Sequence, residues 1–370
     1  MNILYTITGL GLGGAEIATI DIANNMVNRG HRVMILYLKD INVCSQKIHS
    51  NIKVVGLNMS KSPFSLLKAL FKYKQLVSDF KPEVIHSNMY HANMLSRLIK
   101  LIQKHPLLIS SEHNKNIEGR EKMLFYRITD VLSDINTNVS NEATDYFVKK
   151  HAFSLGKSIT VYNGIDINKF KRDENDRIRI RQELGISSEE FVFVNVGRLT
   201  IAKDQINLLR AFEKVLYSKL IIVGSGKLRE EIEKYVINKN MQNRVLLLGK
   251  KLNVHQFYSA ADCFVLSSRW EGFGIALVEA MSCELPVITT DAGGCREVCN
   301  NSEFVVPVKD SESLARKMIY IQHMTKDDQR KLGKANHEQA GKFNIDIICD
   351  LWEKIYFEKS ICSLVLSVER

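Results

Sequence analysis

The residues best suited to chemistry lie in one stretch of the second half of the chain, SSRWEGFGIALVEAM. Glu271 and Glu279 stand eight residues apart, and Gly272 and Gly274 lie between them. If a helix begins near Gly274, Glu279 lies one to two turns inside it and Glu271 lies in the preceding loop. Glycines at a helix N-terminus leave backbone N–H groups accessible, which suits a phosphate or a polyhydroxylated ring. A surface loop with a capping glutamate is the alternative.

A second pattern lies near the N-terminus, where TITGLGLGGAE fits G-x-G-x-x-G through Gly9, Gly11 and Gly14. This spacing is typical of dinucleotide-binding βαβ units. A buried strand is predicted before it at 2–8, and a helix after it at 15–30. An NAD-dependent oxidoreductase is therefore one candidate class, although a single glycine pattern is weak evidence.

Histidines follow two predicted strands of the first half. HSNMYHAN places His86 and His91 at the end of one strand, and ISSEHN places His113 after the next. Ligands of open α/β sheets bind at such strand ends, where a neutral imidazole can orient a hydroxyl. A structural role is the alternative for His113. Because HSNMYHAN has no Cys or carboxylate at zinc spacing, no metal site is predicted there.

Strand-like runs alternate with helical segments along the chain, which predicts parallel sheets covered on both faces. One series comprises ILYTIT, RVMILYL, KVVGL, EVIHS, LLISSEH, INTNVS and ITVYN. A second series comprises FVFVNVG, KLIIVGSG, VLLLGK, CFVLSS, PVITTDAGG and FVVPV. The fold class expected is therefore α/β, with two doubly wound, Rossmann-like domains of similar size. A chain of 370 residues also exceeds the size at which single cores stop growing.

Charge and cysteine content narrow the possible partners and compartments. The net charge is +10, and residues 61–110 hold eight Lys or Arg against two acidic residues. The positive electrostatic potential of this segment suits anionic lipid, phosphate or nucleic acid as a partner. A solvated helix face is the alternative. Within this segment, SPFSLLKALFKYKQLVSDFKP is predicted as a helix that either covers the sheet or rests on anionic lipid.

The seven cysteines form an odd set without C-x-x-C pairs, which favours reduced thiols in a cytosolic protein. The apolar N-terminus has no Lys or Arg before Arg29 and is interpreted as a first strand, not a signal peptide. No apolar run approaches the ~18 residues that a membrane span needs.

Taken together, the motifs resemble those of the retaining glycosyltransferases of family 4. WEGFGIALVEAM is similar to that family's E-x7-E signature, GLGGAE to its first glycine loop, and VYNGIDINKF to its interdomain crossing. VGRLTIAKDQINLLRAF looks like its phosphate-binding segment, and LLGKKLNVHQFYSAADCFVLSSRWEGFG follows in the family's order. The resemblance covers nearly the whole chain.

The resemblance implies the GT-B architecture, in which two Rossmann-like domains face each other across a crevice. We predict an N-terminal acceptor-binding domain at 1–168, a C-terminal nucleotide-sugar-binding domain at 169–349, and a C-terminal helix within 350–370 that returns to the first domain. The charged segment 167–186 is interpreted as a linker or surface helix. The nucleotide is expected in the second domain, so the N-terminal glycine pattern reflects a shared βα turn and not nicotinamide binding.

The resemblance also implies roles in the second domain. Arg198 and Lys203 match the family's basic pair, and a guanidinium with an ammonium suits the diphosphate of the leaving group. Glu279 is expected to bind the ribose hydroxyls, and Glu271 to lie near the donor sugar's hydroxyls without acting as a nucleophile. Main-chain N–H groups are expected around the sugar at Gly272, Phe273 and Gly274. No two aspartates stand two apart, so the D-x-D metal clamp is absent and no metal or other cofactor is expected.

In the first domain, His113 matches the position of a family histidine near the anomeric centre, although Asn114 replaces the commoner aspartate after it. Gly13 and Gly14 are assigned to donor binding, in a loop that lets a phosphate approach the backbone. The residues assigned to the acceptor side are His86, His91 and Asn163.

The resulting prediction is a retaining, metal-independent transfer of a hexose or N-acetylhexosamine from a UDP-sugar to a lipid-linked, polyprenyl-diphosphate saccharide. Bacterial O-antigen and capsule assembly use such steps. The enzyme is expected in the cytoplasm, with the inner face of the cytoplasmic membrane as a docking surface and nucleic acid excluded as a partner. The alternatives are a nucleotide-sugar epimerase of the same architecture, an NAD-dependent oxidoreductase and a non-catalytic sugar-nucleotide sensor.

Overall fold

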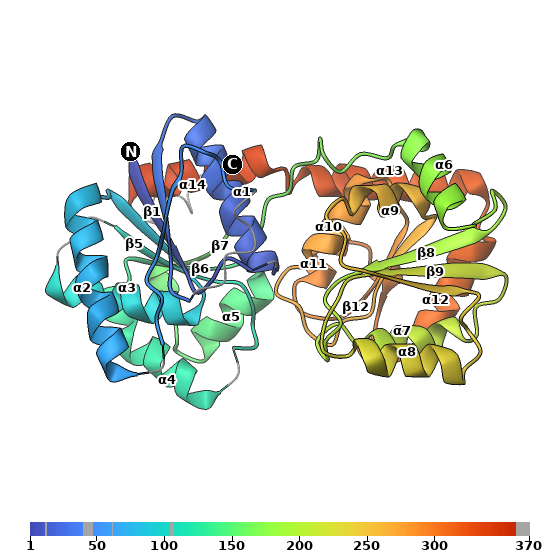
Figure 1. Cartoon of the computed structure of the whole chain (residues 1–370), viewed down its shortest axis with the longest axis horizontal. Coiled ribbons are helices and arrows are strands. Elements are labelled where there is room, and N and C mark those ends of the chain that lie inside the picture. The colour runs from blue at the N-terminus through green and yellow to red at the C-terminus, as the bar shows by residue number, and fades with distance from the viewer. Residues whose placement is uncertain (12, 40–46, 61, 104–106, 118, 360–370) are drawn as a thin grey trace. The chain divides into compact units, whose positions relative to one another are not determined.

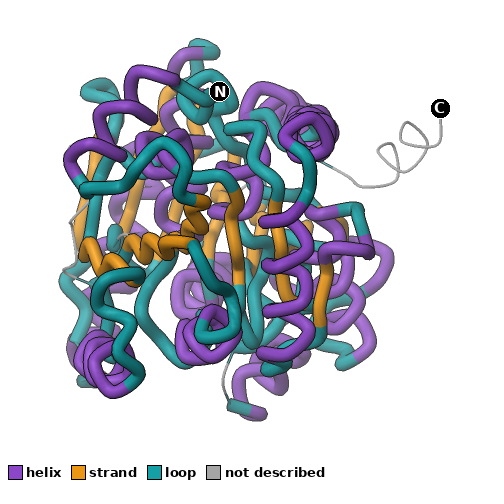
Figure 2. The backbone as a smooth tube through the Cα atoms, turned by 90° about the vertical axis from the view of Figure 1, so that its right-hand side faces the viewer, coloured by secondary structure: helices purple, strands orange, loops and turns teal. Residues whose placement is uncertain are grey.

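A computed structural model describes the chain except for residues 12, 40–46, 61, 104–106, 118 and 360–370. It contains two compact units. The first unit comprises Met1–Gly164 and the segment that begins at Ile345, and the second unit comprises Ile165–Asn344. Each unit has its own sheet, enclosed by helices (Figures 1 and 2). The prediction of two Rossmann-like α/β domains is confirmed.

The first unit is built on a seven-stranded parallel sheet of order β3-β2-β1-β4-β5-β6-β7. Its strands are β1 Asn2–Ile7, β2 Arg32–Tyr37, β3 Lys53–Gly56, β4 Val84–Asn88, β5 Leu108–Glu112, β6 Ile135–Asn138 and β7 Ser158–Thr160. Its helices are α1 Gly14–Asn28, α2 Pro63–Phe80, α3 Tyr90–Ile102, α4 Arg120–Thr129, α5 Asn141–Lys149 and α14 Ile345–Glu358, with short 3-10 turns at Asp130–Leu132 and Leu155–Lys157.

Side-chain alternation along β1 shows why both faces of this sheet are apolar. Ile3, Tyr5 and Ile7 are buried with residues of α1 and α14, whereas Leu4 is buried with residues of α2 and α3. Helices on both faces therefore require the near-continuous apolar strands that the sequence shows.

The second unit has a six-stranded parallel sheet of order β10-β9-β8-β11-β12-β13. Its strands are β8 Phe191–Val196, β9 Ser218–Val223, β10 Val245–Gly249, β11 Cys263–Leu266, β12 Val287–Thr290 and β13 Val305–Val306. Its helices are α6 Glu174–Glu183, α7 Gln205–Phe212, α8 Arg229–Asn238, α9 His255–Ala260, α10 Ile275–Ser282, α11 Cys295–Cys299, α12 Ser311–His323 and α13 Lys326–Gly341, with a 3-10 turn at Ser302–Phe304. Helices α7, α8 and α12 share one apolar core with the strands, and α9, α10 and α13 lie on the opposite face (Figure 1).

The chain passes between the units at two points that lie side by side. Ile165 forms a parallel β-bridge with Asn344, and its N–H donates to the Phe343 carbonyl at 2.9 Å. Gly164 packs so closely that a Cβ there would lie 2.8 Å from the Ile345 Cα. Because the two crossings pair, the unit boundaries fall at 164/165 and 344/345, a few residues before the predicted boundaries at 168/169 and 349/350.

The charged segment 167–186 is a surface helix of the second unit and not a flexible linker. It contains α6, whose N-cap Asp173 accepts a hydrogen bond from the Asp176 N–H at 2.9 Å. Arg177 of α6 donates to Asp262 at 2.7 Å and to the Ala261 carbonyl at 2.8 Å. These bonds fix α6 on the unit beside α9.

Helix α2 forms where the basic, apolar pattern predicted it. Ser62 caps it by accepting from the Ser65 N–H, and Pro63 occupies its first turn. Its buried face consists of Ala69, Tyr73, Val77 and Phe80, and three large apolar residues remain exposed on its other face, namely Phe64, Leu67 and Phe71. Across the described residues, no helix is both long and apolar enough to cross a membrane.

Candidate active site

The topology of each sheet defines one preferred position for a ligand. In the first unit β1 lies between β2 and β4, and in the second unit β8 lies between β9 and β11, so the chain order reverses beside β1 and beside β8. Open α/β sheets bind ligands at the carboxyl ends of the strands next to such a reversal. In the second unit the loops 197–204 and 267–274 flank this position, and they carry three of the predicted catalytic residues, namely Arg198, Lys203 and Glu271.

Lys203 and Glu271 are brought into direct contact. The Lys203 ammonium forms an ion pair with Glu271 Oε1, and the Ser268 hydroxyl donates to the same oxygen at 2.6 Å. The methylene groups of Lys203 pack beside Gly197. Both charged side chains keep a small exposed fraction, 20% for Lys203 and 12% for Glu271. The pair is therefore held in place and still accessible to a ligand.

Three polar residues that the sequence analysis did not assign fix the two loops around this pair. Arg269 binds the Asp204 carboxylate through two hydrogen bonds, at 2.6 and 3.0 Å. The Ser267 hydroxyl donates to the carbonyls of Lys203 and Asp204 at 3.0 and 3.1 Å. These residues flank the motifs in the sequence, but their partners are far along the chain, so only the folded structure pairs them.

A glycine in the DAGG segment supports the backbone of Glu271. Gly293 has a φ of +65°, and a Cβ at this position would lie 2.1 Å from the Glu271 carbonyl oxygen. A side chain there would displace the loop that carries the carboxylate. The segment PVITTDAGG was predicted only as a strand and its turn, so this contact was missed.

Helix α10 begins after Gly274, as the sequence predicted, and Gly274 adopts the left-handed conformation with a φ of +87°. Glu279 lies within the helix, half-buried, and accepts a hydrogen bond from the Tyr258 hydroxyl at 2.8 Å. Burial, together with the charge of Glu279, raises the pKa of Tyr258 well above its ordinary value. Tyr258 therefore stays a hydrogen-bond donor that orients this carboxylate.

Gly272 and Phe273, predicted to surround the donor sugar with main-chain N–H groups, are buried at the start of α10. The Phe273 ring packs edge-on against Phe343, with ring centroids 5.2 Å apart. The aromatic side chain thus anchors the loop in the core, while its backbone lies at the helix N-terminus, where N–H groups lack partners within the helix.

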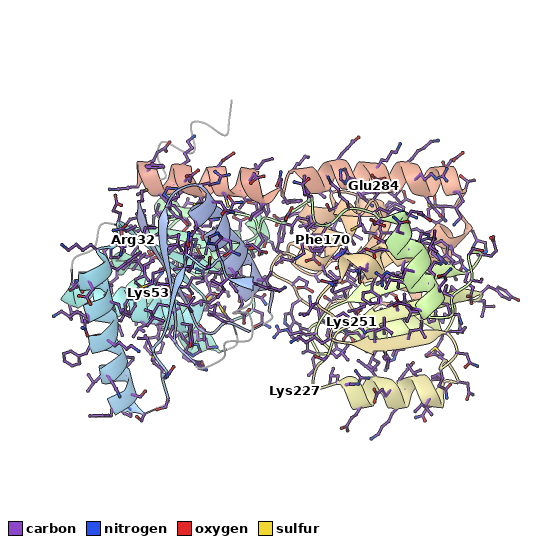
Figure 3. The ribbon with its side chains drawn as sticks, turned by 45° about the horizontal axis from the view of Figure 1, so that its top comes forward. Arg32, Lys53, Phe170, Lys227, Lys251 and Glu284 are labelled. Atoms are coloured by element: carbon purple, nitrogen blue, oxygen red, sulfur yellow. The ribbon has the colours of Figure 1, made fainter. Side chains whose placement is uncertain are left out.

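Arg198 is exposed in the loop after β8. Its carbonyl accepts from the Gln205 side chain at 3.1 Å, and its guanidinium has no ion pair among the described residues. Lys227 and Lys251 lie in the loops after β9 and β10, at the same edge of the sheet (Figure 3). The carboxyl edge of this sheet therefore carries several cations in addition to Lys203.

In the first unit, the predicted glycine loop is the N-terminus of α1, with Gly13 as its N-cap. The Glu16 carboxylate folds over Gly13, since a Cβ there would lie 2.3 Å from Glu16 Oε2. Gly14 is exposed. Asn163, assigned to the acceptor side, is 6% exposed and immediately precedes Gly164 at the crossing.

Of the three predicted histidines, His113 and His91 lie at the carboxyl edge of the first sheet. His113 follows β5, and its Nε2 lies 2.9 Å from Asn88 Oδ1 at the end of β4. Burial lowers the pKa of His113 to about 4. His91 is exposed in the first turn of α3.

The acceptor-side assignment of His86 is corrected by its position in the core. Its Nδ1 lies 2.7 Å from the Tyr356 hydroxyl of α14, and its Nε2 lies 2.8 Å from the Ser111 hydroxyl. The residue is 2% exposed, and burial lowers its pKa to about 3. Because residue 86 is inside a central strand and its ring contacts Tyr356, His86 helps attach the C-terminal helix.

A buried carboxyl that the sequence analysis did not assign lies beside His113. Glu112 ends β5, is 4% exposed, and accepts a hydrogen bond from the Tyr126 hydroxyl. Arg97 stacks over the Tyr126 ring at 4.9 Å. Burial raises the pKa of Glu112 to about 7. The sequence pattern that could have identified Glu112 is a charged residue at the end of an apolar strand, as in LLISSEH.

The described residues contain no cluster of three or more His, Cys, Asp or Glu side chains placed to hold a metal ion. The five described cysteines, Cys263, Cys283, Cys295, Cys299 and Cys349, are buried free thiols, and Cys44 and Cys362 lie outside the described residues.

Comparison with known proteins gives two matching family models. The model for Glycosyltransferase Family 4 matches residues 12–169, and the model for Glycosyl transferases group 1 matches residues 176–339. Among solved structures, that of Anabaena HepE in complex with UDP and glucose has a TM-score of 0.84 at 22% identity, with 97% of this chain and 100% of that chain covered. At this identity the likeness concerns the fold.

Three relatives illustrate the range of similar proteins. An uncharacterized glycosyltransferase of Methanocaldococcus jannaschii is 32% identical over 260 residues, which is 64% of this chain and 62% of that protein's length. The UDP-Gal:alpha-D-GlcNAc-diphosphoundecaprenol alpha-1,3-galactosyltransferase of Escherichia coli is 26% identical over 69% of this chain and 70% of its own. The N-acetyl-alpha-D-glucosaminyl L-malate synthase of Bacillus anthracis is 26% identical over 94% of each chain.

Proposed function

This chain belongs to the glycosyltransferases of family 4, and from that premise we propose that it transfers a hexose or N-acetylhexosamine from a UDP-sugar to a lipid-linked saccharide, with retention of the anomeric configuration. The observation that carries the proposal is the contact between Lys203 and Glu271 at the reversal of the second sheet, with Arg198 exposed in the same loop as Lys203. The ion pair and the nearby guanidinium support a role for the cations at a diphosphate and for the carboxylate at sugar hydroxyls.

The cations act on the leaving group. As the bond between the anomeric carbon and the diphosphate oxygen breaks, negative charge builds up on the phosphate, and Arg198 and Lys203 stabilise it. Backbone N–H groups at the start of α10 add further donors. The acceptor hydroxyl forms the new bond on the face that the leaving group vacates, and its proton passes to the departing phosphate. In this proposal no metal is needed.

The two carboxylates hold the donor. We assign Glu279, which accepts a hydrogen bond from the Tyr258 hydroxyl, to the ribose hydroxyls, and Glu271 to the hydroxyls of the donor sugar. When a donor binds, its phosphates compete with Glu271 for the three N–H donors of Lys203. The E. coli relative uses UDP-Gal, and the HepE structure holds UDP and glucose, which supports a UDP-sugar donor for this chain.

The lipid-linked acceptor is supported by two relatives and by one surface. The E. coli relative and a Campylobacter jejuni relative that is 29% identical over 52% of this chain are named for diphosphoundecaprenol-linked substrates. Helix α2 exposes Phe64, Leu67 and Phe71, and three lysines are exposed on the same helix, Lys68, Lys72 and Lys74. Apolar side chains with flanking cations suit an anionic membrane surface, so we place the enzyme at the inner face of the cytoplasmic membrane.

The decisive experiment measures nucleotide release from UDP- and GDP-sugars by the full chain, with EDTA present. Undecaprenyl-diphosphate-linked N-acetylglucosamine is the first acceptor, and L-malate is the second because the B. anthracis relative is named for it. Release of UDP that depends on the lipid acceptor, with an α-linked product by NMR from an α-linked donor, is the expected result. Release only with L-malate would overturn the acceptor class.

The alternatives give other outcomes in the same assay. Conversion of a UDP-sugar without any acceptor indicates an epimerase, and a change in nicotinamide absorbance indicates an oxidoreductase. Tight UDP-sugar binding without release or conversion indicates a sensor.

A further inference from the structure

The turn that follows β4 holds an unusual backbone conformation next to His113. Met89 has a φ of +73° and a ψ of 153°, a region almost confined to glycine. Its N–H donates to the Ser111 carbonyl at 3.0 Å, and its carbonyl accepts from the Asn93 N–H at 2.9 Å. These bonds on both sides hold the strained residue in place. Strain of this kind concentrates at functional sites, and Asn88 immediately precedes the strained residue.

The orientation of the Asn88 side chain is fixed by two hydrogen bonds. Its Nδ2 donates to the His86 carbonyl at 3.3 Å, and its Oδ1 lies 2.9 Å from His113 Nε2. The opposite orientation of the amide would set its oxygen against the carbonyl oxygen of His86. Asn88 therefore presents an acceptor to His113, and Nε2 must carry the ring proton. With Asn88 only 2% exposed, water competes poorly for this bond.

The other ring nitrogen of His113 is then an unprotonated acceptor. Among the described residues Nδ1 has no hydrogen-bond partner, although it is buried from solvent. His86 on β4 interacts electrostatically with His113, Glu112 accepts a hydrogen bond from the His113 backbone, and burial lowers the pKa of the imidazole and keeps it neutral. An acceptor buried without a partner is unfavourable unless a ligand supplies a donor.

We propose that Asn88 is a positioning residue that fixes His113 as the Nε2–H tautomer, so that Nδ1 accepts a hydrogen bond from a hydroxyl of the bound sugar substrate. The proposal rests on the proposed glycosyltransferase function and adds a selectivity rule to it. A sugar with a hydroxyl at this position pairs with Nδ1. A sugar that lacks this hydroxyl leaves the acceptor unpaired and should bind more weakly.

The tautomer is tested without any activity measurement. Full-length protein labelled with 15N-histidine is compared with a His113→Gln variant to assign the ring nitrogens by NMR. We expect Nε2 protonated and Nδ1 bare from pH 6 to 8. Asn88→Asp keeps the shape of the side chain but adds a carboxylate, so both nitrogens should become protonated at pH 6. Asn51→Asp, at an exposed position, is the matched control and should leave the His113 signals unchanged. A protonated Nδ1 in the native chain overturns the proposal, whether or not Asn88→Asp folds.

The effect on catalysis is tested by the pH profile of kcat/KM for the donor that the release assay identifies. For Asn88→Asp we expect about a tenfold loss from pH 8 to pH 6, because the added carboxylate raises the pKa of the ring toward neutrality, while the native enzyme and Asn51→Asp stay nearly flat. A profile for Asn88→Asp that is parallel to the native one contradicts the positioning role. If the native chain transfers no sugar, the proposed function fails, and the NMR result still decides the tautomer.

Discussion

The Lys203 ammonium and the Glu271 carboxylate form an ion pair between the loop after β8 and the loop after β11, although the two residues are 68 positions apart in the sequence. The pair lies where the chain order of the second sheet reverses. Parallel strands deliver the loops that follow them to one edge, so this contact is a consequence of β8 and β11 being neighbours.

Removing the ammonium should impair catalysis far more than folding. For Lys203→Ala we expect a fall in kcat/KM on the order of 10²- to 10³-fold, because the developing phosphate charge loses a preorganised cation. The free energy of unfolding should fall by about 1–3 kcal/mol, because the pair is mostly buried but Glu271 keeps the hydrogen bond from Ser268. Lys214→Ala breaks an exposed ion pair with Glu312 and serves as the control. Full UDP release by Lys203→Ala would refute the assigned role.

Substitutions of Glu279 and Arg198 should affect different quantities, namely the affinity for UDP and the turnover rate. Glu279→Gln is expected to raise the dissociation constant for UDP about tenfold, because it loses a charged acceptor for the ribose hydroxyls. Arg198→Ala should mainly lower kcat, since its exposed guanidinium acts on charge that appears in the transition state. Calorimetry with UDP and steady-state kinetics give the two readings, and the reverse pattern would contradict the assignment.

Gly293 should tolerate no side chain. Gly293→Ala places a Cβ 2.1 Å from the Glu271 carbonyl oxygen at a φ of +65°, so we expect about 1–3 kcal/mol of destabilisation and a displaced Glu271. Activity should fall further than the unfolded fraction explains. Gly156→Ala is the control because a Cβ there meets nothing within 4 Å. Equal behaviour of the two variants in urea unfolding and in UDP release would show that the close contact does not matter.

Glu112 should make stability depend on pH in an unusual direction. Burial raises its pKa from 4.5 to about 7, so between these values the folded state holds a proton that the unfolded state has released. The free energy of unfolding is therefore not reduced by Glu112 below pH 4.5 and decreases as the pH rises from 4.5 toward 7. Above pH 7 the ionised, buried carboxylate lowers it by about 3 kcal/mol.

Glu112→Gln tests this sign, because glutamine stays neutral and still accepts from the Tyr126 hydroxyl. In urea unfolding the variant should be more stable than the native chain at pH 8 and close to it at pH 4.5. Glu183→Gln, at an exposed carboxylate, should show no such difference. A stability gap for Glu112→Gln that is the same at both pH values would mean that the carboxyl is ionised throughout.

The exposed face of α2 should bind anionic vesicles. Replacing Lys68, Lys72 and Lys74 by alanine removes about 1 kcal/mol of attraction per lysine, which predicts about 100-fold weaker binding to vesicles rich in phosphatidylglycerol at low salt. Phe71→Ala should weaken the binding that remains at high salt. The charge-matched control replaces three exposed lysines of the second unit, Lys214, Lys331 and Lys334. Equal binding by both triple variants would exclude α2 as the docking surface.

Much of the fold was predictable because its strands and helices follow from local sequence patterns. Buried parallel strands are visible as short apolar runs, and each predicted run from ILYTIT to FVVPV overlaps a strand of the structure. The start of α10 was predictable as well, since Gly274 marks it by taking a conformation that other residues adopt with difficulty. The structure divides into units a few residues before the predicted domain boundaries, where Ile165 pairs with Asn344, a residue far along the chain.

The sequence predicted which types of residue form the candidate site, but it did not predict which of them contact one another. The spacing of Glu271 and Glu279 and the basic residues after FVFVNVG were visible in the sequence, whereas Asp204, Arg269 and Gly293 acquire their roles only through partners brought close by the fold. His86 and His113 read alike in the sequence, as histidines near strand ends. The structure separates them, because one points from a central strand into the core toward Tyr356 and the other follows its strand.

The order of strands and helices, the two Rossmann-like units and the family are all visible in the sequence, because apolar periodicity and motif spacing depend on only a few residues at a time. Only the folded chain shows which charges meet, which histidine contacts the C-terminal helix and which carboxyl holds its proton near neutral pH. Those properties depend on burial and on neighbours distant in the chain, as the Lys203–Glu271 pair and the Glu112–Tyr126 hydrogen bond illustrate.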